Sequence, residues 1–144
     1  MKTLAHTLWI AKDLQEEAIA LSLDAEKASD RIDWGYLFAT LKKFGLGDQF
    51  LAKVRLQYEN PMVQVNCEEF LSEPFKINRG TQQGCLLSPL LFVVTMELLA
   101  ASFRQTPSLA GISIPGGLSK AYLYADDVLL TLTDLPHSLS VLLN

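Results

Sequence analysis

The chain has 144 residues, enough for one domain, and 49% of them are apolar, a high share for a free-standing domain of this length. We therefore expect a piece of a larger protein, with apolar faces that meet neighbouring segments. The formal net charge of −4 argues against capture of nucleic acid by a broad basic surface.

Cysteine usage and the apolar runs bear on location. Two cysteines and two histidines are too few for a structural zinc site or a disulfide framework, and they suit a reducing, intracellular compartment without distinguishing nucleus from cytoplasm. Residues 1–11 carry no cleavage-site pattern, so a signal peptide is not expected. The most apolar run, residues 86–103, contains Ser88, Pro89 and Glu97, which favours a core helix over a membrane span.

The chain begins with a helix and a strand. Residues 3–14 have the apolar spacing of a short helix, and the compact run 18–23 predicts a central, buried strand that ends at Asp24. A carboxylate in that place lies at the rim of a sheet, where active sites of layered folds collect. It would serve equally as the cap of the segment that follows.

Two helices and a strand pair are expected next. Asp33 is a good N-cap for a helix that ends at Gly45, and residues 48–58 predict a second helix with its apolar side chains in the core. Residues 62–66 and 71–77 predict two strands, of which the second is an edge strand because it contains a proline. This pair is suited to face a nucleic-acid strand, and a plain sheet edge explains it as well.

A glycine-bracketed loop, residues 78–85, follows this strand pair. Ser88 and Pro89 then have the N-cap and first-turn chemistry of a helix start, and residues 90–103 are apolar nearly all round, which predicts burial on several sides. Such a loop can hold a flat or sugar-bearing ligand against backbone amides, but many glycine turns only connect elements.

The last third predicts a hairpin within residues 121–132, with Asp126 and Asp127 at its tip. A short strand at 112–114 and a turn at 115–117 precede it, and a helix starts near Pro136. Adjacent aspartates at a tip are compatible with a hydrated turn. They are also compatible with a bivalent-metal site, because a hard cation stabilises two neighbouring carboxylates as anions.

The strand ending in Asp24, the glycine loop and the aspartate hairpin resemble, in order and in residues, the palm of reverse transcriptases, most closely those of LINE-type (non-LTR) retrotransposons. LSLDAEKASDRIDW is similar to the first catalytic block of that family, RGTQQGCLLSPLLF to its nucleotide-site block and YADD to its second catalytic block. The resemblance covers about residues 21–135. It implies one partial reverse transcriptase domain over residues 1–144, with its palm core at about 18–135.

The resemblance also implies a chemistry and a set of roles. The family joins a dNTP to the 3′-hydroxyl of a DNA primer on an RNA template, with two Mg²⁺ ions at the reacting groups. The implied roles are metal ligation by Asp24 and Asp126 with support from Asp127, a backbone carbonyl from Ala25 for the nucleotide-bound metal, contacts to the incoming nucleotide from Gln83 and Gly84, and packing of Tyr124 beside the primer terminus.

This sequence departs from the family pattern at three places. Ser29 stands where the family usually has an aromatic residue that excludes a 2′-hydroxyl, so that role is not carried over. Gln82 replaces a usual arginine and Leu86 a usual proline. By the same resemblance, we expect the fingers segment upstream and the primer grip and thumb downstream to lie outside these 144 residues.

We therefore expect an α/β (α+β), polymerase palm-like fold, a small mostly antiparallel sheet backed by helices. The expected function is RNA-directed DNA synthesis, with this chain inactive by itself and no membrane partner. The alternative is a non-catalytic retrotransposon-derived remnant that keeps the palm shape. Another metal-dependent nucleotidyl enzyme, such as a nucleotide cyclase, is disfavoured by the Gln-Gly loop and the YADD sequence.

Overall fold

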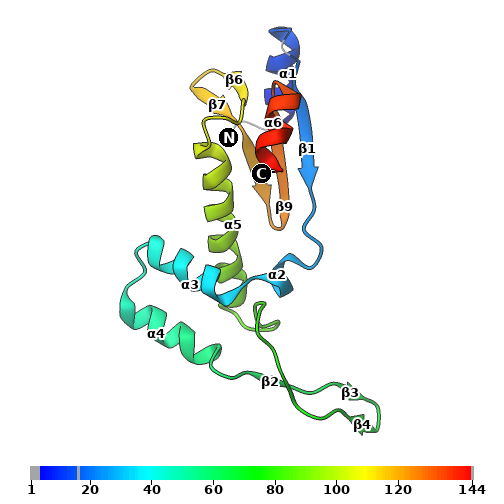
Figure 1. The fold of residues 1–144 in the computed structure, drawn as a ribbon, viewed down its shortest axis with the longest axis vertical. Coiled ribbons are helices and arrows are strands. Elements are labelled where there is room, and N and C mark those ends of the chain that lie inside the picture. Colours follow the sequence, from blue (N-terminus) through cyan, green and yellow to red (C-terminus); the bar gives the residue numbers. More distant parts are fainter. Residues whose placement is uncertain (1–3, 16, 144) are drawn as a thin grey trace. The chain divides into compact units, whose positions relative to one another are not determined.

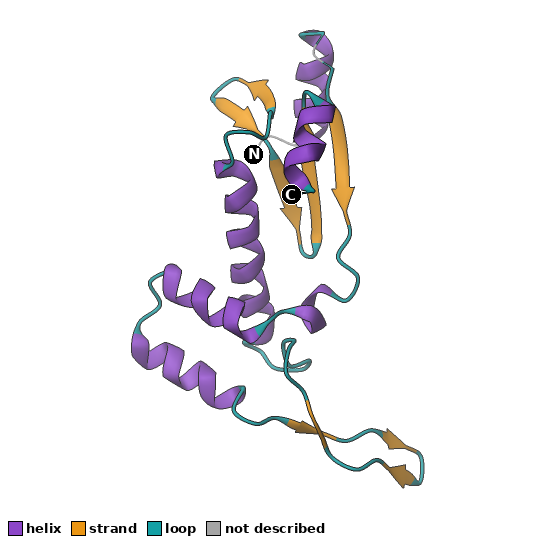
Figure 2. Cartoon of the chain, in the orientation of Figure 1, coloured by secondary structure: helices purple, strands orange, loops and turns teal. Residues whose placement is uncertain are grey.

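The computed structural model describes residues 4–15 and 17–143. They divide into two compact units, one of the described residues within Met1–Glu26 and Met96–Asn144 and the other of Lys27–Thr95, and each unit is described by itself. Within the described residues no helix has the length and apolar character needed to cross a membrane. Figure 2 shows the mixture of helices and strands, and every strand pair is antiparallel, which confirms the expected α+β class.

A three-stranded sheet organises the first unit (Figure 1). Its order is β1 (Ile19–Leu23), β9 (Asp127–Leu132) and β8 (Ala121–Tyr124). Strand β1 pairs with β9 from Ile19↔Leu132 to Leu23↔Val128. Strands β8 and β9 form the expected hairpin, so residues about a hundred positions apart in the sequence become neighbours in one sheet.

The prediction that residues 18–23 form the central, buried strand is wrong in its position. The strand exists, but β9 lies between β1 and β8, and β1 is exposed except for a half-buried Leu21. Strand β9 is the one with four buried residues, Val128, Leu130, Thr131 and Leu132. An apolar run indicates that a strand can be buried. Which strand has a neighbouring strand on each side, and so becomes buried, depends on the pairing of distant segments.

Helices cover this sheet and close its core. Buried Leu109, Val128, Leu130 and Leu132 form the centre of the core. Side chains of α5 (Ser88–Gln105) and α6 (Leu135–Leu142) pack against it, among them Met96, Phe103, Val141 and Leu142. The sheet backed by helices is therefore confirmed, and α6 begins next to the predicted Pro136.

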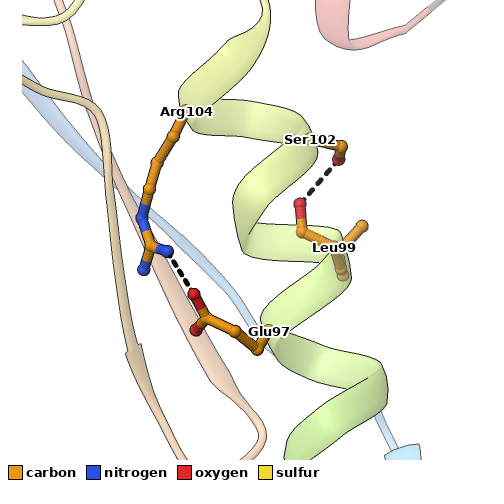
Figure 3. A network of polar contacts seen from close by, with 4 residues as sticks. All are labelled: Glu97, Leu99, Ser102 and Arg104. Carbon is orange, nitrogen blue, oxygen red and sulfur yellow. Dashed lines mark hydrogen bonds and ion pairs between the residues drawn. The ribbon is translucent and has the colours of Figure 1, made fainter. Parts of the chain in front are cut away.

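Polar contacts fix the elements around this core. The hydroxyl of Thr7 on α1 (Leu4–Asp13) contacts the Tyr122 hydroxyl, which also accepts a 2.8 Å hydrogen bond from Ser119. Ser119 lies in β7 (Gly117–Ser119), a strand that the sequence analysis missed and that pairs with β6 (Ile112–Ile114). On α5, Arg104 and Glu97 form a 2.5 Å ion pair, shown with its neighbours in Figure 3.

The second unit is built from helices α2 (Ala28–Arg31), α3 (Trp34–Lys43) and α4 (Asp48–Gln57) and the first half of α5. Asp33 caps α3 as expected, since its carboxylate accepts a 2.9 Å hydrogen bond from the Tyr36 amide. The buried core of this unit consists of Ile32, Leu37, Leu41, Leu51, Val54 and Leu91.

Two burial predictions in this unit are wrong. Phe50 on α4 is 38% exposed, and on α5 Leu90 and Val93 are 63% and 56% exposed, although both helices read as mostly buried. A helix buries only the stripe that faces a neighbour, so an all-round apolar sequence is covered only where described segments pack on it.

The predicted strands at 62–66 and 71–77 form an interrupted hairpin (Figure 1). Strand β2 (Met62–Val63) pairs with β5 (Phe75–Lys76), and β3 (Asn66–Cys67) pairs with β4 (Phe70–Leu71). The expected proline, Pro74, lies between β4 and β5, where its missing N–H breaks no pair. The turn is Glu68-Glu69, because Cys67 and Phe70, which lie between the two predicted strands, form a pair.

A close backbone contact joins the start of this unit to the glycine loop. The Gly80 amide donates to the Ile32 carbonyl at 2.8 Å, and the Thr81 amide donates to the Ser29 carbonyl at 2.9 Å. The indole Nε1 of Trp34 donates to the Gly80 carbonyl at 2.8 Å. Gly80 has φ +90°, and a Cβ at this position would lie 2.8 Å from the Asp30 carbonyl oxygen.

We expect Gly80→Ala to lower the free energy of unfolding by about 2 kcal/mol, because it adds a backbone clash to the strain of a positive φ. Gly84→Ala is the matched control, since Gly84 has φ +80° but no atom within 4 Å of the added Cβ. Urea denaturation followed by circular dichroism measures both. Equal losses for the two variants would show that the contact with Asp30 contributes nothing.

Candidate active site

Asp24, Asp126 and Asp127 lie at one end of the three-stranded sheet. Leu23↔Val128 is the last pair of β1 with β9, so Asp24 and Asp127 are the next residues at the same end. Tyr124↔Asp127 closes the β8–β9 hairpin, which leaves Asp126 in the turn. The fold therefore brings the strand-end carboxylate to the end of the sheet that carries the hairpin turn.

The hairpin tip differs in detail from the prediction. Its two turn residues are Ala125 and Asp126, and Asp127 is already the first residue of β9. Ala125 has φ +54°, a left-handed conformation that costs an L-residue roughly 1–2 kcal/mol. Two-residue hairpin turns require a positive φ at their first central position. The register of β8 with β9 thus holds Ala125 in this conformation.

All five site residues of this unit are exposed: Asp24, Ala25, Tyr124, Asp126 and Asp127. The side chain of Tyr124 is 83% exposed, so its ring is available to a partner molecule. Exposure keeps the carboxylates hydrated, which allows negative charges to share one end of the sheet.

The carboxylates of Asp24, Asp126 and Asp127 are suitable ligands for a divalent metal, but their side chains are not arranged as a metal site. Carboxylate oxygens are the ligands that Mg²⁺ prefers. Across residues 4–15 and 17–143, however, no three His, Cys, Asp or Glu side chains are grouped closely enough to hold an ion. The backbone therefore collects the right residues at one end of the sheet without converging their side chains.

The glycine loop lines a pocket of its own, with a volume of about 210 Å³, in the unit of residues 27–95. Gln83 and Gly84 contribute to it, together with Ser29 from the first catalytic block. The Gln83 amide donates to the Asp30 carboxylate at 3.4 Å, near the limit for a hydrogen bond. Gln83 and Gly84 thus belong to the unit of residues 27–95, whereas Asp24, Asp126 and Asp127 belong to the other unit.

Phe92 is a pocket residue that the sequence analysis did not single out. It lies on α5, four residues after Ser88, so both side chains are on the same side of the first helical turns. The four-residue spacing from Ser88, together with the loop before the helix, was the signal in the sequence that could have identified Phe92 as a pocket residue. A phenylalanine in an apolar helix reads as core, however, and here Phe92 is half-buried and borders the pocket.

Cys85 also lines the pocket, and its thiol has a lowered pKa. The Leu87 amide, followed by the Ser88 hydroxyl and amide, stabilises the Cys85 thiolate and lowers the pKa of that thiol below its ordinary value. Burial raises the pKa of the nearby Tyr58 hydroxyl, and the negative charge of a Cys85 thiolate raises it further.

We expect Cys85 to be alkylated by iodoacetamide with a pH midpoint below that of a cysteine in an unstructured peptide. Ser88→Ala removes one stabilising donor, so it should move this midpoint upward. Ser102→Ala is the control, because the Ser102 hydroxyl donates to the Leu99 carbonyl further along the same helix. Peptide mass spectrometry across pH 6–10 measures the rates, and an identical midpoint in Ser88→Ala would contradict the assignment.

Comparison with known proteins shows which family has this sequence pattern. A family model described as reverse transcriptase (RNA-dependent DNA polymerase) matches residues 2–144. The chain is 35% identical over 115 residues to the transposon TX1 uncharacterized 149 kDa protein of Xenopus laevis, covering 80% of this chain and 9% of that protein. It is 33% identical over 109 residues to the retrovirus-related Pol polyprotein from type-2 retrotransposable element R2DM of Drosophila melanogaster, covering 76% of this chain and 10% of that protein.

A solved structure supports the fold. The structure of telomerase from Candida albicans in complex with a TWJ fragment of telomeric RNA matches 94% of this chain and 26% of its own chain, with a TM-score of 0.51 and 13% sequence identity. The chain thus spans about a tenth of the length of the curated relatives, and its fold is that of part of a polymerase palm. By the family match and these relatives, the chain belongs to the reverse transcriptase family, in its LINE-type branch.

Proposed function

We propose that the chain supplies the catalytic carboxylates for RNA-directed DNA synthesis, in which a dNTP is joined to the 3′-hydroxyl of a DNA primer on an RNA template. The observation that carries this proposal is the β1–β9 register, which ends at Leu23↔Val128 and leaves Asp24 beside the end of the hairpin that bears Asp126 and Asp127. A two-metal polymerase needs carboxylates from distant segments at one point.

The proposed roles are those that the family resemblance implies, and they are compatible with where each group lies. Asp24 and Asp126 hold the metals, Asp127 supports the second carboxylate, and the exposed Ala25 offers a backbone carbonyl. When bound, two Mg²⁺ ions would supply activation of the primer hydroxyl and stabilisation of the leaving pyrophosphate. Because like charges repel, the carboxylates stay apart and hydrated until positive charge is present among them.

The chain's other proposed contacts are with nucleotide and primer. The exposed ring of Tyr124 provides a flat apolar surface beside the carboxylates, suited to pack on a primer terminus. Gln83 and Gly84 border the 210 Å³ pocket, where an amide side chain and open backbone can contact an incoming dNTP. Nucleic-acid partners are also proposed because the telomerase neighbour was solved with telomeric RNA.

The alternative, a remnant that keeps the palm shape without activity, is favoured by the departures from the family pattern. Ser29 lines the pocket with a small side chain, Gln82 brings no charge to it, and Leu86 is 95% exposed. Each change removes a packing or charge contribution near the nucleotide. The acidic residues are nevertheless all present, so the two proposals differ in a measurable quantity, Mg²⁺-dependent DNA synthesis.

We expect Asp126→Asn to reduce primer extension on an RNA template by about a hundredfold or more, because one ligand charge is lost at the reacting groups. The assay uses the longest natural polypeptide that contains this sequence, with dNTPs and Mg²⁺. Asp134→Asn is the control: Asp134 is exposed in the same unit at φ +48°, a conformation that asparagine tolerates.

Equal activity of the two variants would remove Asp126 from the mechanism. Absence of extension by the wild-type polypeptide, with intact folding, would instead support the remnant. The inactivity of residues 1–144 by themselves stays a prediction, and the same assay applied to the 144-residue chain tests it.

A further inference from the structure

The hairpin of residues 62–77 is the largest feature of the second unit that the proposed function does not use. Every residue of 62–79 is exposed except the half-buried Ser72, and within its unit the hairpin extends away from helices α3 and α4 (Figure 1). Its exposed apolar side chains include Met62, Val63, Val65, Phe70, Leu71, Phe75 and Ile77. Phe70 is 79% exposed and Leu71 is 61% exposed, and exposed apolar residues that occur together in this way mark a site of interaction.

The register of the hairpin places several of these side chains on one face. Val63 pairs with Phe75 and Cys67 pairs with Phe70, and paired residues point to the same side of a ladder. Ser72 helps to hold the register of β3 with β4. Its amide donates to the Val65 carbonyl at 2.9 Å, and its hydroxyl accepts from the Val65 amide at 2.9 Å.

The two pairings are out of step by one residue, so the second strand has a bulge near Pro74. Alternation along the first strand keeps Val63, Val65 and Cys67 on one side. The bulge therefore allows Phe70 and Phe75 to share that side, although they are an odd number of positions, five, apart in the sequence. We call the set Val63, Val65, Cys67, Phe70 and Phe75 the hairpin face.

Charge around the hairpin face restricts what can cover it. The hairpin carries Glu68 and Glu69 at its turn and Glu73 at its bulge, against a single lysine, Lys76. Phosphate groups would be repelled by this local excess of negative charge, so a nucleic-acid strand is disfavoured. A second copy of the hairpin would bring the same carboxylates against each other, which disfavours self-association through this face.

We propose that the hairpin face docks an extended protein segment in which apolar residues alternate with lysine or arginine. The apolar side chains of such a segment would cover the phenylalanines, and its cations would pair with Glu68, Glu69 and Glu73. Both outer strand edges are open in the described part of the chain, so the segment can also add as a further strand through backbone hydrogen bonds. This inference is independent of catalysis.

The test uses the 144-residue chain and two synthetic peptides labelled with fluorescein, one alternating valine with lysine and one alternating valine with glutamate. Fluorescence anisotropy should show binding of the lysine peptide and at least tenfold weaker binding of the glutamate peptide. Glu68→Lys combined with Glu69→Lys should weaken the lysine peptide about tenfold. Asp13→Lys combined with Glu17→Lys changes the net charge equally at exposed positions in the other unit and should leave binding unchanged.

A neutral variant separates shape from charge. Phe70→Ser should also weaken the lysine peptide, while circular dichroism shows the fold to be retained, because Phe70 is 79% exposed. Equal effects of the two charge-reversal pairs, or equal binding of the two peptides, would overturn the proposal. It would also be overturned by an RNA oligonucleotide that binds the wild type and loses affinity in Phe70→Ser, or by a dimer in sedimentation that Phe70→Ser dissociates.

Discussion

The antiparallel pairing of β1 with β9 is the constraint on which the rest of the candidate site depends. It joins two segments about a hundred residues apart in the sequence, and it ends one residue before Asp24 on one strand and one residue after Asp127 on the other. Because side chains alternate along strands, a slip by one residue would turn Leu21 away from the core that contains Val128 and Leu130. The apolar pattern of the sheet thus fixes the position of the acidic residues.

Left-handed backbone conformations occur within the reverse transcriptase blocks, as they do at several turns elsewhere in the described residues. Ala125 occupies a left-handed conformation in the YADD turn, and Gly80 and Gly84 have positive φ in the loop next to the pocket that Ser29 and Gln83 line. At Gly80 the conformation brings two backbones close enough to exclude a Cβ, while the Trp34 indole holds the Gly80 carbonyl. Local conformations of this kind persist only where surrounding hydrogen bonds and packing determine them. The loop and the hairpin are therefore held by their neighbours.

Negative charge has opposite consequences in the two units. At one end of the three-stranded sheet, the β1–β9 register positions carboxylates from two strands, and these carboxylates are proposed to bind cations. On the hairpin of residues 62–77, glutamates lie around the hairpin face, and we infer that they repel the phosphate groups of nucleic acids. A chain with a net charge of −4 can thus take part in nucleic-acid chemistry, provided that cations or basic segments from elsewhere complete its surfaces.

Local signals in the sequence predicted the elements well. Asp33 caps α3, Gly45 follows its end, Pro89 lies in the first turn of α5, and the apolar runs on either side of YADD form β8 and β9. They succeeded because caps, glycines and prolines act over a few residues. The missed elements, α2 and β7, are a four-residue and a three-residue segment whose hydrogen bonds depend on neighbours far along the chain or across a turn.

By itself, the sequence determined which residues are available for chemistry: the acidic groups Asp24, Asp126 and Asp127, the loop around Gln83, and the family to which they belong. The tertiary structure alone decided that β9 is the central strand, that Asp127 opens that strand while Ala125 and Asp126 make the turn, and that Phe50, Leu90 and Val93 remain exposed. The reason is that residue type and periodicity are local properties. Strand order, register and burial are set by which distant segments pair, and that pairing is a property of the whole chain.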